Sequence, residues 1–167
     1  APWLHNTDNA NIPATIAGEI ARLTTLELQS KVEGSPRAEC MDAVYQQVLG
    51  KLRVQTEYAF AKGSMVFKPY ITPDGTIAVQ YIQADMFFPL DFDSEKMTRC
   101  AFLDQFRKGN EIYSRIELYS LSGDVLSIKN HVFIARTEGI LGTEVPIGTV
   151  PRWAELAEEM QFSGIQK

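Results

Sequence analysis

The chain has 167 residues, of which 45% are hydrophobic and 22% charged, a composition typical of a folded globular protein. Its formal net charge is -5 and its basic residues are scattered, which argues against a general grip on nucleic-acid phosphates. No apolar run approaches the roughly 20 residues that a membrane-spanning helix needs. We expect a single domain over residues 1–167.

A first amphipathic helix is predicted to begin near Asn11, with Pro13 in its first turn, and to end around Gly34. Four apolar residues recur along it at three- and four-residue steps: Ile12, Ile16, Ile20 and Leu23. This spacing places them on one stripe, which we expect to face the core.

A second helix is predicted to start after Ser35 and Pro36 and to stop at Gly63, so that the helical part spans 11–62. It carries a second apolar stripe formed by Met41, Val44, Tyr45, Val48 and Leu52. The two helices should pack on a sheet through these stripes.

Residues 63–135 predict an antiparallel meander of roughly five strands, with a longer acidic connection between the second and third. Its turns carry glycine at Pro73-Asp74-Gly75, Lys108-Gly109-Asn110 and Ser122-Gly123-Asp124. Three-residue loops are favoured at all three turns because they align apolar residues across the strands. They pair Ile71 with Ile77, Arg107 with Glu111 and Leu118 with Ile128.

The tail over 136–167 is expected to be irregular, with a short closing helix between Val150 and Met160. The predicted fold is therefore α+β, with two N-terminal amphipathic helices packed on the meander and a short C-terminal helix.

Two features of the meander suggest protein contacts. Pro69 lies inside the first strand and cannot donate to a ladder, so that strand should be an edge or carry a bulge. The run from Met86 to Leu90 is an apolar knot in what should be a connection. It either folds back under the sheet or faces a partner. The candidate protein-contact residues are Pro69, Met86, Phe87, Phe88 and Pro89.

No constellation of residues predicts catalysis. His131 alternates with polar residues and is expected at the surface, and no serine has the context of a nucleophile elbow. The acidic residues Asp85, Asp91, Asp93 and Glu95 do not follow a calcium-loop spacing. Cys40 and Cys100 lack metal-ligand spacing and are expected to be buried, reduced thiols. We predict no catalytic, cofactor-binding or metal-binding residue, no cofactor and no enzymatic activity.

Several segments together resemble tailed-phage portal proteins, in particular the portal-like minor capsid proteins carried by prophages. The segments lie in order over nearly the whole chain: residues 16–23 (IAGEIARL), 61–63 (AKG), 67–70 (FKPY), 83–89 (QADMFFP), and Val145-Pro146 followed by Trp153. No segment is a catalytic signature, so the resemblance rests on their order and coverage.

The resemblance implies a structural subunit of a ring, usually of twelve copies, at one capsid vertex. Such rings support capsid assembly, dock the packaging motor, contact scaffold and capsid proteins, let DNA pass without specific binding and join head to tail. Helices followed by a β-rich meander look like the wing region. Stretches resembling the stem helices, the clip and the tunnel loop are missing, so the chain resembles a fragment of a longer protein. The implied location is the virion, or the bacterial cytoplasm during assembly or expression from a prophage, with no membrane contact.

Two other functions remain open. An α+β domain can enclose an apolar cavity and act as an enzyme or small-molecule binder. That function would need polar groups such as Asp104, Tyr113 or Glu117 turned into the cavity. The other possibility is a phage head or tail structural protein different from the portal.

Overall fold

The computed structural model describes residues 11–164. Their contacts divide the chain into two compact units, Ala1–Ala84 and Asp85–Lys167. The division falls within the stretch predicted as one meander, and the strands form two antiparallel sheets. The prediction of one sheet of roughly five strands is therefore wrong, since two of the expected strands form a separate hairpin and the other sheet has six strands.

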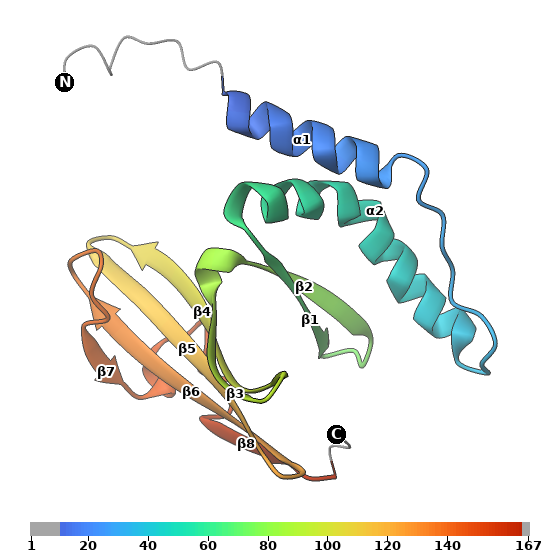
Figure 1. Ribbon diagram of the computed structural model, residues 1–167. Coiled ribbons are helices and arrows are strands. Elements are labelled where there is room, and N and C mark those ends of the chain that lie inside the picture. The colour runs from blue at the N-terminus through green and yellow to red at the C-terminus, as the bar shows by residue number, and fades with distance from the viewer. Residues whose placement is uncertain (1–10, 165–167) are drawn as a thin grey trace, which may run out of the picture. The chain divides into compact units, whose positions relative to one another are not determined.

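The first unit consists of two helices and a hairpin: α1 (Ile12–Thr25), α2 (Ala38–Lys62), β1 (Met65–Ile71) and β2 (Ile77–Gln83). Helix α2 packs on the hairpin, and α1 packs on α2 (Figure 1). Gly63 ends α2 as predicted, with a φ of 91° and its N–H donating to the Ala59 carbonyl at 2.8 Å.

Helix α1 is shorter than predicted and ends at Thr25, well before Gly34. The Thr25 hydroxyl donates to the Ala21 carbonyl at 2.7 Å, a side-chain bond to the backbone that slightly destabilises a helix. The loop that follows is tied to α2, because the Val32 N–H donates to Asp42 Oδ1 at 2.8 Å. This hydrogen bond lowers the pKa of the Asp42 carboxyl.

The β1–β2 hairpin has the predicted register, with Ile71 opposite Ile77. The Gly75 N–H donates to the Thr72 carbonyl at 2.9 Å, and Gly75 adopts a φ of 83°. A type I turn followed by a left-handed glycine is the usual three-residue hairpin loop. The turn chemistry at Pro73-Asp74-Gly75 is therefore confirmed.

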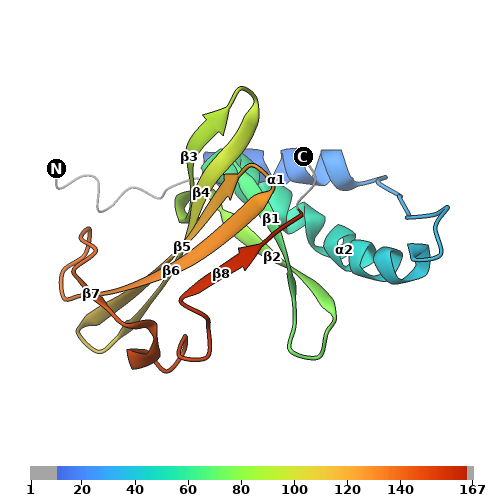
Figure 2. The same ribbon diagram turned by 90° about the horizontal axis from the view of Figure 1, so that it is seen from below.

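The second unit is built on a six-stranded sheet in the order β3-β4-β5-β6-β7, with β8 also paired to β6. The strands are β3 (Phe87–Asp93), β4 (Lys96–Lys108), β5 (Glu111–Ser122), β6 (Val125–Ala135), β7 (Thr143–Val145) and β8 (Glu159–Phe162). Both β7 and β8 lie along the same edge of β6 (Figure 2). Two short 3-10 turns, η2 (Ala84–Met86) and η3 (Ile147–Thr149), precede β3 and follow β7.

Two predicted elements of this unit are wrong. The acidic connection is the edge strand β3 and its tight turn to β4, since an apolar run with one proline suits an edge strand. The predicted closing helix is a series of turns after Val150, followed by β8, which pairs with the edge of β6.

The registers of the last two hairpins also differ from the prediction. Lys108 pairs with Glu111 and Leu118 with Lys129, so both loops have two residues. Gly109 and Gly123 open these loops with φ values of 61° and 62°. Glycine at the first central position is typical of the type II′ turn, whose twist matches the flanking strands. The predicted three-residue loops are therefore wrong, because the preference of glycine for this turn outweighs the alignment of apolar residues across the strands.

A hydrophobic cluster of the second unit lies on one face of the sheet, under the segment 146–156. Val132 on β6 is buried beneath Ile147, Val150 and Trp153 of that segment. Burial of this kind stabilises a fold by roughly 1.5–3 kcal/mol for each large apolar side chain. The segment therefore covers part of one face and leaves the other face without it.

Candidate protein-contact surface

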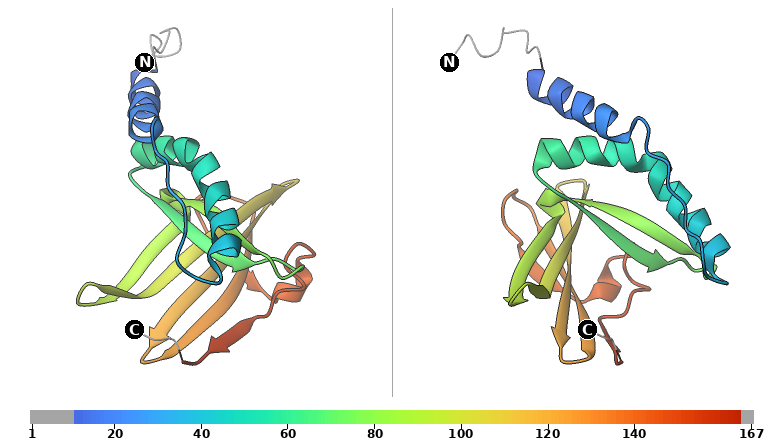
Figure 3. Two further views of the ribbon diagram at one scale, coloured as in Figure 1. Left: turned by 90° about the vertical axis from the view of Figure 1, so that its right-hand side faces the viewer. Right: turned by 45° about the vertical axis from the view of Figure 1, so that its right-hand side comes forward.

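Helix α1 has two apolar faces, and only one is covered within the first unit. Its buried residues are Ala17 and Ala21, which are 4% and 0% exposed. A Cβ added to Gly18 would lie 3.7 Å from the Glu57 side chain of α2, so this small-residue face packs closely on α2. Figure 3 shows α1 lying along α2.

Three of the four residues of the predicted stripe are exposed, and the fourth, Ile20, is half-buried. Ile12, Ile16 and Leu23 are 61%, 55% and 60% exposed, and they recur at the spacing of one helical stripe. Positions 17 and 21 lie on the opposite side of the helix from this stripe. The prediction that the stripe forms the core is wrong for the isolated chain, because small residues allow a closer approach to α2.

Two substitutions separate these faces. Ala21→Leu is expected to lower the free energy of unfolding of the first unit by about 1–3 kcal/mol, because added methylenes overpack a closed contact. Ile16→Ser should change it by less than about 0.5 kcal/mol, because the side chain is exposed. Urea unfolding followed by far-ultraviolet circular dichroism checks both. Equal effects of the two variants would contradict the assignment of the faces.

The open face of the six-stranded sheet carries an apolar groove over β3, β4 and β5. The cross-strand pairs Ala101–Leu118 and Leu103–Ile116 place four aliphatic side chains on this face. The groove is lined by Phe88, Leu90, Ala101, Phe102, Leu103, Ile116, Leu118 and Leu141. All eight residues are apolar, so the groove offers burial to a partner and no ionisable group.

The structure separates the residues of the predicted apolar knot. Phe87 is half-buried, and its ring centroid lies 5.1 Å from that of Phe102, which lies opposite Glu117 of β5. Phe88, one residue on, is 43% exposed and lines the groove. Met86 is half-buried in η2 and Pro89 is exposed on β3. The run therefore neither folds back as a plug nor stands out as a loop.

Pro69 lies on β1, opposite Val79 of β2. It is exposed and belongs to the first unit, whereas the other predicted contact residues belong to the second. The groove residues of β4, β5 and the loop after β6 were not predicted from the sequence. The glycine-first loops at Gly109-Asn110 and Gly123-Asp124 were the signal that would have given the correct register.

A polar network lies on the covered face, where the rival function would need convergent groups. Asp104 accepts a hydrogen bond from Trp153 Nε1 at 3.0 Å, and its Oδ2 lies 4.0 Å from Arg115 Nη2. The same guanidinium lies 3.6 Å from Glu117 Oε2 and donates to Asn130 Oδ1 at 3.2 Å. The network ties strands β4, β5 and β6 to the segment that covers them.

Two tyrosines of β5 are neutral donors to glutamates. Tyr119 donates to Glu117 Oε1 at 2.9 Å, and burial followed by the Glu117 charge raises the pKa of its phenol well above the usual value. Tyr113 donates to Glu111 at 2.7 Å, and this bond also raises its pKa. Both phenols therefore keep their protons at neutral pH, and neither acts as a base there.

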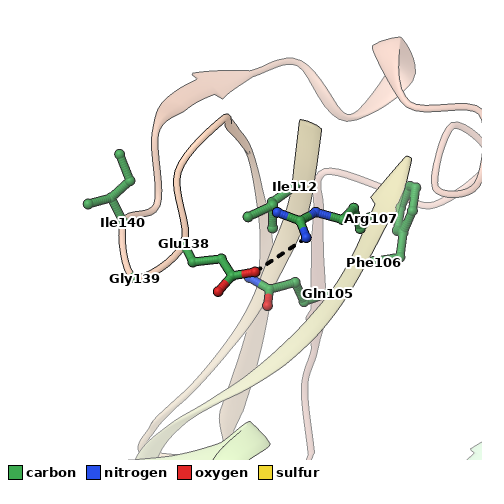
Figure 4. Close-up of a pocket in the computed structure, with 7 residues that line it drawn as sticks. All are labelled: Gln105, Phe106, Arg107, Ile112, Glu138, Gly139 and Ile140. Carbon is green, nitrogen blue, oxygen red and sulfur yellow. Dashed lines mark ion pairs between the residues drawn. The ribbon is translucent and has the colours of Figure 1, made fainter. Parts of the chain in front are cut away.

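A pocket lies between β4, β5 and the loop after β6 (Figure 4). Its walls include Phe106, Ile112 and Ile140, and Arg107 faces Glu138 across it at 3.4 Å. This ion pair is largely exposed, so it is solvated and contributes little. None of Asp104, Tyr113 and Glu117, the residues that the rival function requires, lines this pocket.

Within residues 11–164, no three His, Cys, Asp or Glu side chains gather into a possible metal site. Neither Cys40 nor Cys100 forms a disulfide; Cys40 is exposed and Cys100 is half-buried, so the prediction of two buried thiols is wrong. His131 Nδ1 lies 2.7 Å from Glu144 Oε1 at the surface. Neither helix of the described part is long and apolar enough to cross a membrane.

Comparisons of the chain with protein-family models, with curated proteins and with solved structures found no match.

Proposed function

We propose that this chain is the wing-like part of a phage portal subunit. In this role it is a structural component of a ring at the capsid vertex that supports capsid assembly, DNA packaging and head-to-tail joining. A structural role is supported by the groove on the open face of the second unit, which is lined by eight apolar residues. An exposed apolar surface of this kind is typical of a protein contact.

The composition of the groove favours a protein partner over a small molecule. A small-molecule site combines apolar walls with a few polar groups that orient the ligand. Here every lining side chain is apolar, whereas the nearby ionisable groups Asp104, Arg115 and Glu117 bind one another elsewhere. That the chain catalyses no reaction stays a prediction.

The choice of a portal ring as the assembly rests on the resemblance of the sequence to portal proteins. A ring requires two different surfaces on each subunit, because head-to-tail contacts close only when one patch meets another. The exposed stripe of α1 and the groove over β3 to β5 are two such apolar surfaces. Twelve copies in the full-length protein, with packaging motor, scaffold and capsid proteins as partners, complete the proposal.

The substitution Phe88→Asp in the full-length protein tests the groove. We expect at least a tenfold loss of rings at a fixed subunit concentration, or about 1.4 kcal/mol, because a carboxylate in an apolar contact must be desolvated. Secondary structure should be unchanged, since Phe88 is already 43% exposed. Electron microscopy of negatively stained particles and circular dichroism give the two readouts.

Leu156→Asp is the matched control, because Leu156 is 41% exposed on the same unit and does not line the groove. Rings should form normally with this variant. Normal rings with Phe88→Asp would remove the groove from the contact. A full-length protein that forms no ring at micromolar concentration would contradict the portal proposal itself.

A further inference from the structure

The outer edge of β2 carries an inference that is independent of the portal proposal. The Thr72 N–H donates to the Thr76 carbonyl at 2.9 Å, so the backbone groups of this pair face each other. In an antiparallel ladder this orientation alternates, and every second pair faces inward. The backbone groups of Ala78, Gln80 and Ile82 therefore point toward β1.

The intervening residues of β2 point their backbone groups away from β1. These residues are Ile77, Val79, Tyr81 and Gln83. No described strand pairs with them, because the hairpin forms a sheet of only two strands. A row of unpaired donors and acceptors is a template for another strand.

The outer edge of β1 is protected by comparison. Pro69 is the direct partner of Val79, so it occupies the same outward set. It has no N–H, and thus removes a donor from the outer edge without any loss to the hairpin. The asymmetry between the two edges of one hairpin leaves β2 as the edge suited to pairing.

The other sheet edges of the described chain are also poor partners. Strand β3 contains Pro89 and shifts register between Pro89 and Phe92. Strands β7 and β8 have three and four residues. Proline, bulges and short length are the usual protections of an edge. The strand best able to pair with β2 is therefore β2 of a second copy.

The sequence of β2 is complementary to itself. It reads IAVQYIQ and contains no charged residue, so no like charges would meet across an antiparallel pair. With Gln80 opposite the partner's Gln80, the outward residues of each strand meet one another. Val79 then lies opposite the partner's Tyr81, a β-branched residue beside an aromatic one, which is a favourable cross-strand pair.

We propose that two copies of this chain pair antiparallel through the outer edges of their β2 strands. The pairing joins two hairpins into one four-stranded sheet about a two-fold axis at Gln80. This two-fold contact differs from the head-to-tail contacts that close a ring. Gln80 is exposed on its own chain and has no part in the groove of the second unit.

Charge exchange at the two-fold axis tests the proposal on the full chain. Gln80→Lys and Gln80→Glu should each raise the dimer dissociation constant at least about tenfold, because like charges then meet across the axis. An equimolar mixture of the two variants should recover the affinity. Sedimentation velocity gives the constants, and Gln47→Lys with Gln47→Glu, at an exposed position of α2, should change nothing.

A cysteine at the axis supplies a second test. In a non-hydrogen-bonded antiparallel pair the Cα atoms lie about 4.5 Å apart, within the range that a disulfide bridges. Gln80→Cys, made with Cys40→Ser to remove the exposed thiol, should oxidise to a covalent dimer. Gln47→Cys in the same background should not. A chain that stays monomeric at a concentration about 100 times a micromolar dissociation constant would overturn the proposal. Failure of the charge-exchanged mixture to associate would overturn it too.

Discussion

Trp153→Ala is expected to lower the free energy of unfolding of the second unit by about 3–5 kcal/mol. Trp153 is 2% exposed and packs on Val132 and Val150. Its ring also meets Phe106 edge to face, with centroids 5.2 Å apart. Removal of the ring leaves a cavity that the strands beneath cannot fill, since β5 and β6 are held in register on both sides.

The same substitution also removes a hydrogen bond from Trp153 Nε1 to Asp104. Trp153→Phe separates the two losses, because it keeps most of the apolar volume and removes only the donor. This variant should cost about 1–3 kcal/mol, the usual contribution of a hydrogen bond to a charged group, while Asp104 keeps its ion pairs with Arg115 and Arg152. Urea unfolding measured by circular dichroism gives both values. A loss below about 1 kcal/mol for Trp153→Ala would show that the segment does not secure this face.

Gly142→Ala is expected to cost at least about 3 kcal/mol, through strain and collision together. Gly142 adopts a φ of 82°, which favours glycine. A Cβ at this position would lie 2.1 Å from the carbonyl oxygen of Ile134 and 2.8 Å from the Cα of Ala135. Both atoms belong to the backbone of β6, so no side-chain rotation can relieve the contact.

Gly139 supplies the matched control in the same loop. Its φ is 81°, but a Cβ there would meet nothing within 4 Å. Gly139→Ala should therefore cost only the conformational penalty, about 1 kcal/mol. The fluorescence of Trp153 follows unfolding of this unit if Trp3, the other tryptophan, is replaced by phenylalanine. Equal costs at the two glycines would show that the loop moves away from β6.

The sequence predicted the positions of most strands in residues 63–135 better than it predicted which residues lie opposite one another. The register of the β1–β2 hairpin was predicted correctly from Pro73-Asp74-Gly75, because a three-residue loop requires a left-handed residue at the position of Gly75. The later hairpins were assigned by aligning apolar residues, which assumes that one face is apolar and the other polar. In the structure Leu118 lies opposite Lys129, since both faces of this sheet carry apolar and polar residues.

The helices show a related limit of periodicity. The spacing of Ile12, Ile16 and Leu23 identifies an apolar stripe correctly but cannot say what covers it. The structure places Ala17 and Ala21 against α2 instead, because small side chains allow the close approach of two helices. An exposed stripe and a buried stripe have the same pattern in the sequence.

The candidate site was predicted in part. Phe88 belongs to the apolar run that was predicted as a candidate protein contact, and it does line the groove. Leu103, Leu118 and Leu141 were not identified, because they come from β4, β5 and a distant loop and meet only through the correct register. A groove assembled from separate strands has no local signature in the sequence.

The edges of the six-stranded sheet have a consequence for handling the protein. At one end β6 is capped by two strands of three and four residues, and at the other β3 is interrupted by Pro89 and a register shift. Lateral stacking of this sheet into fibrils needs long, regular edges, which these ends do not provide. Concentrated preparations of the second unit should thus cluster reversibly through the groove and stay free of amyloid, despite the many β-branched and aromatic side chains in the strands.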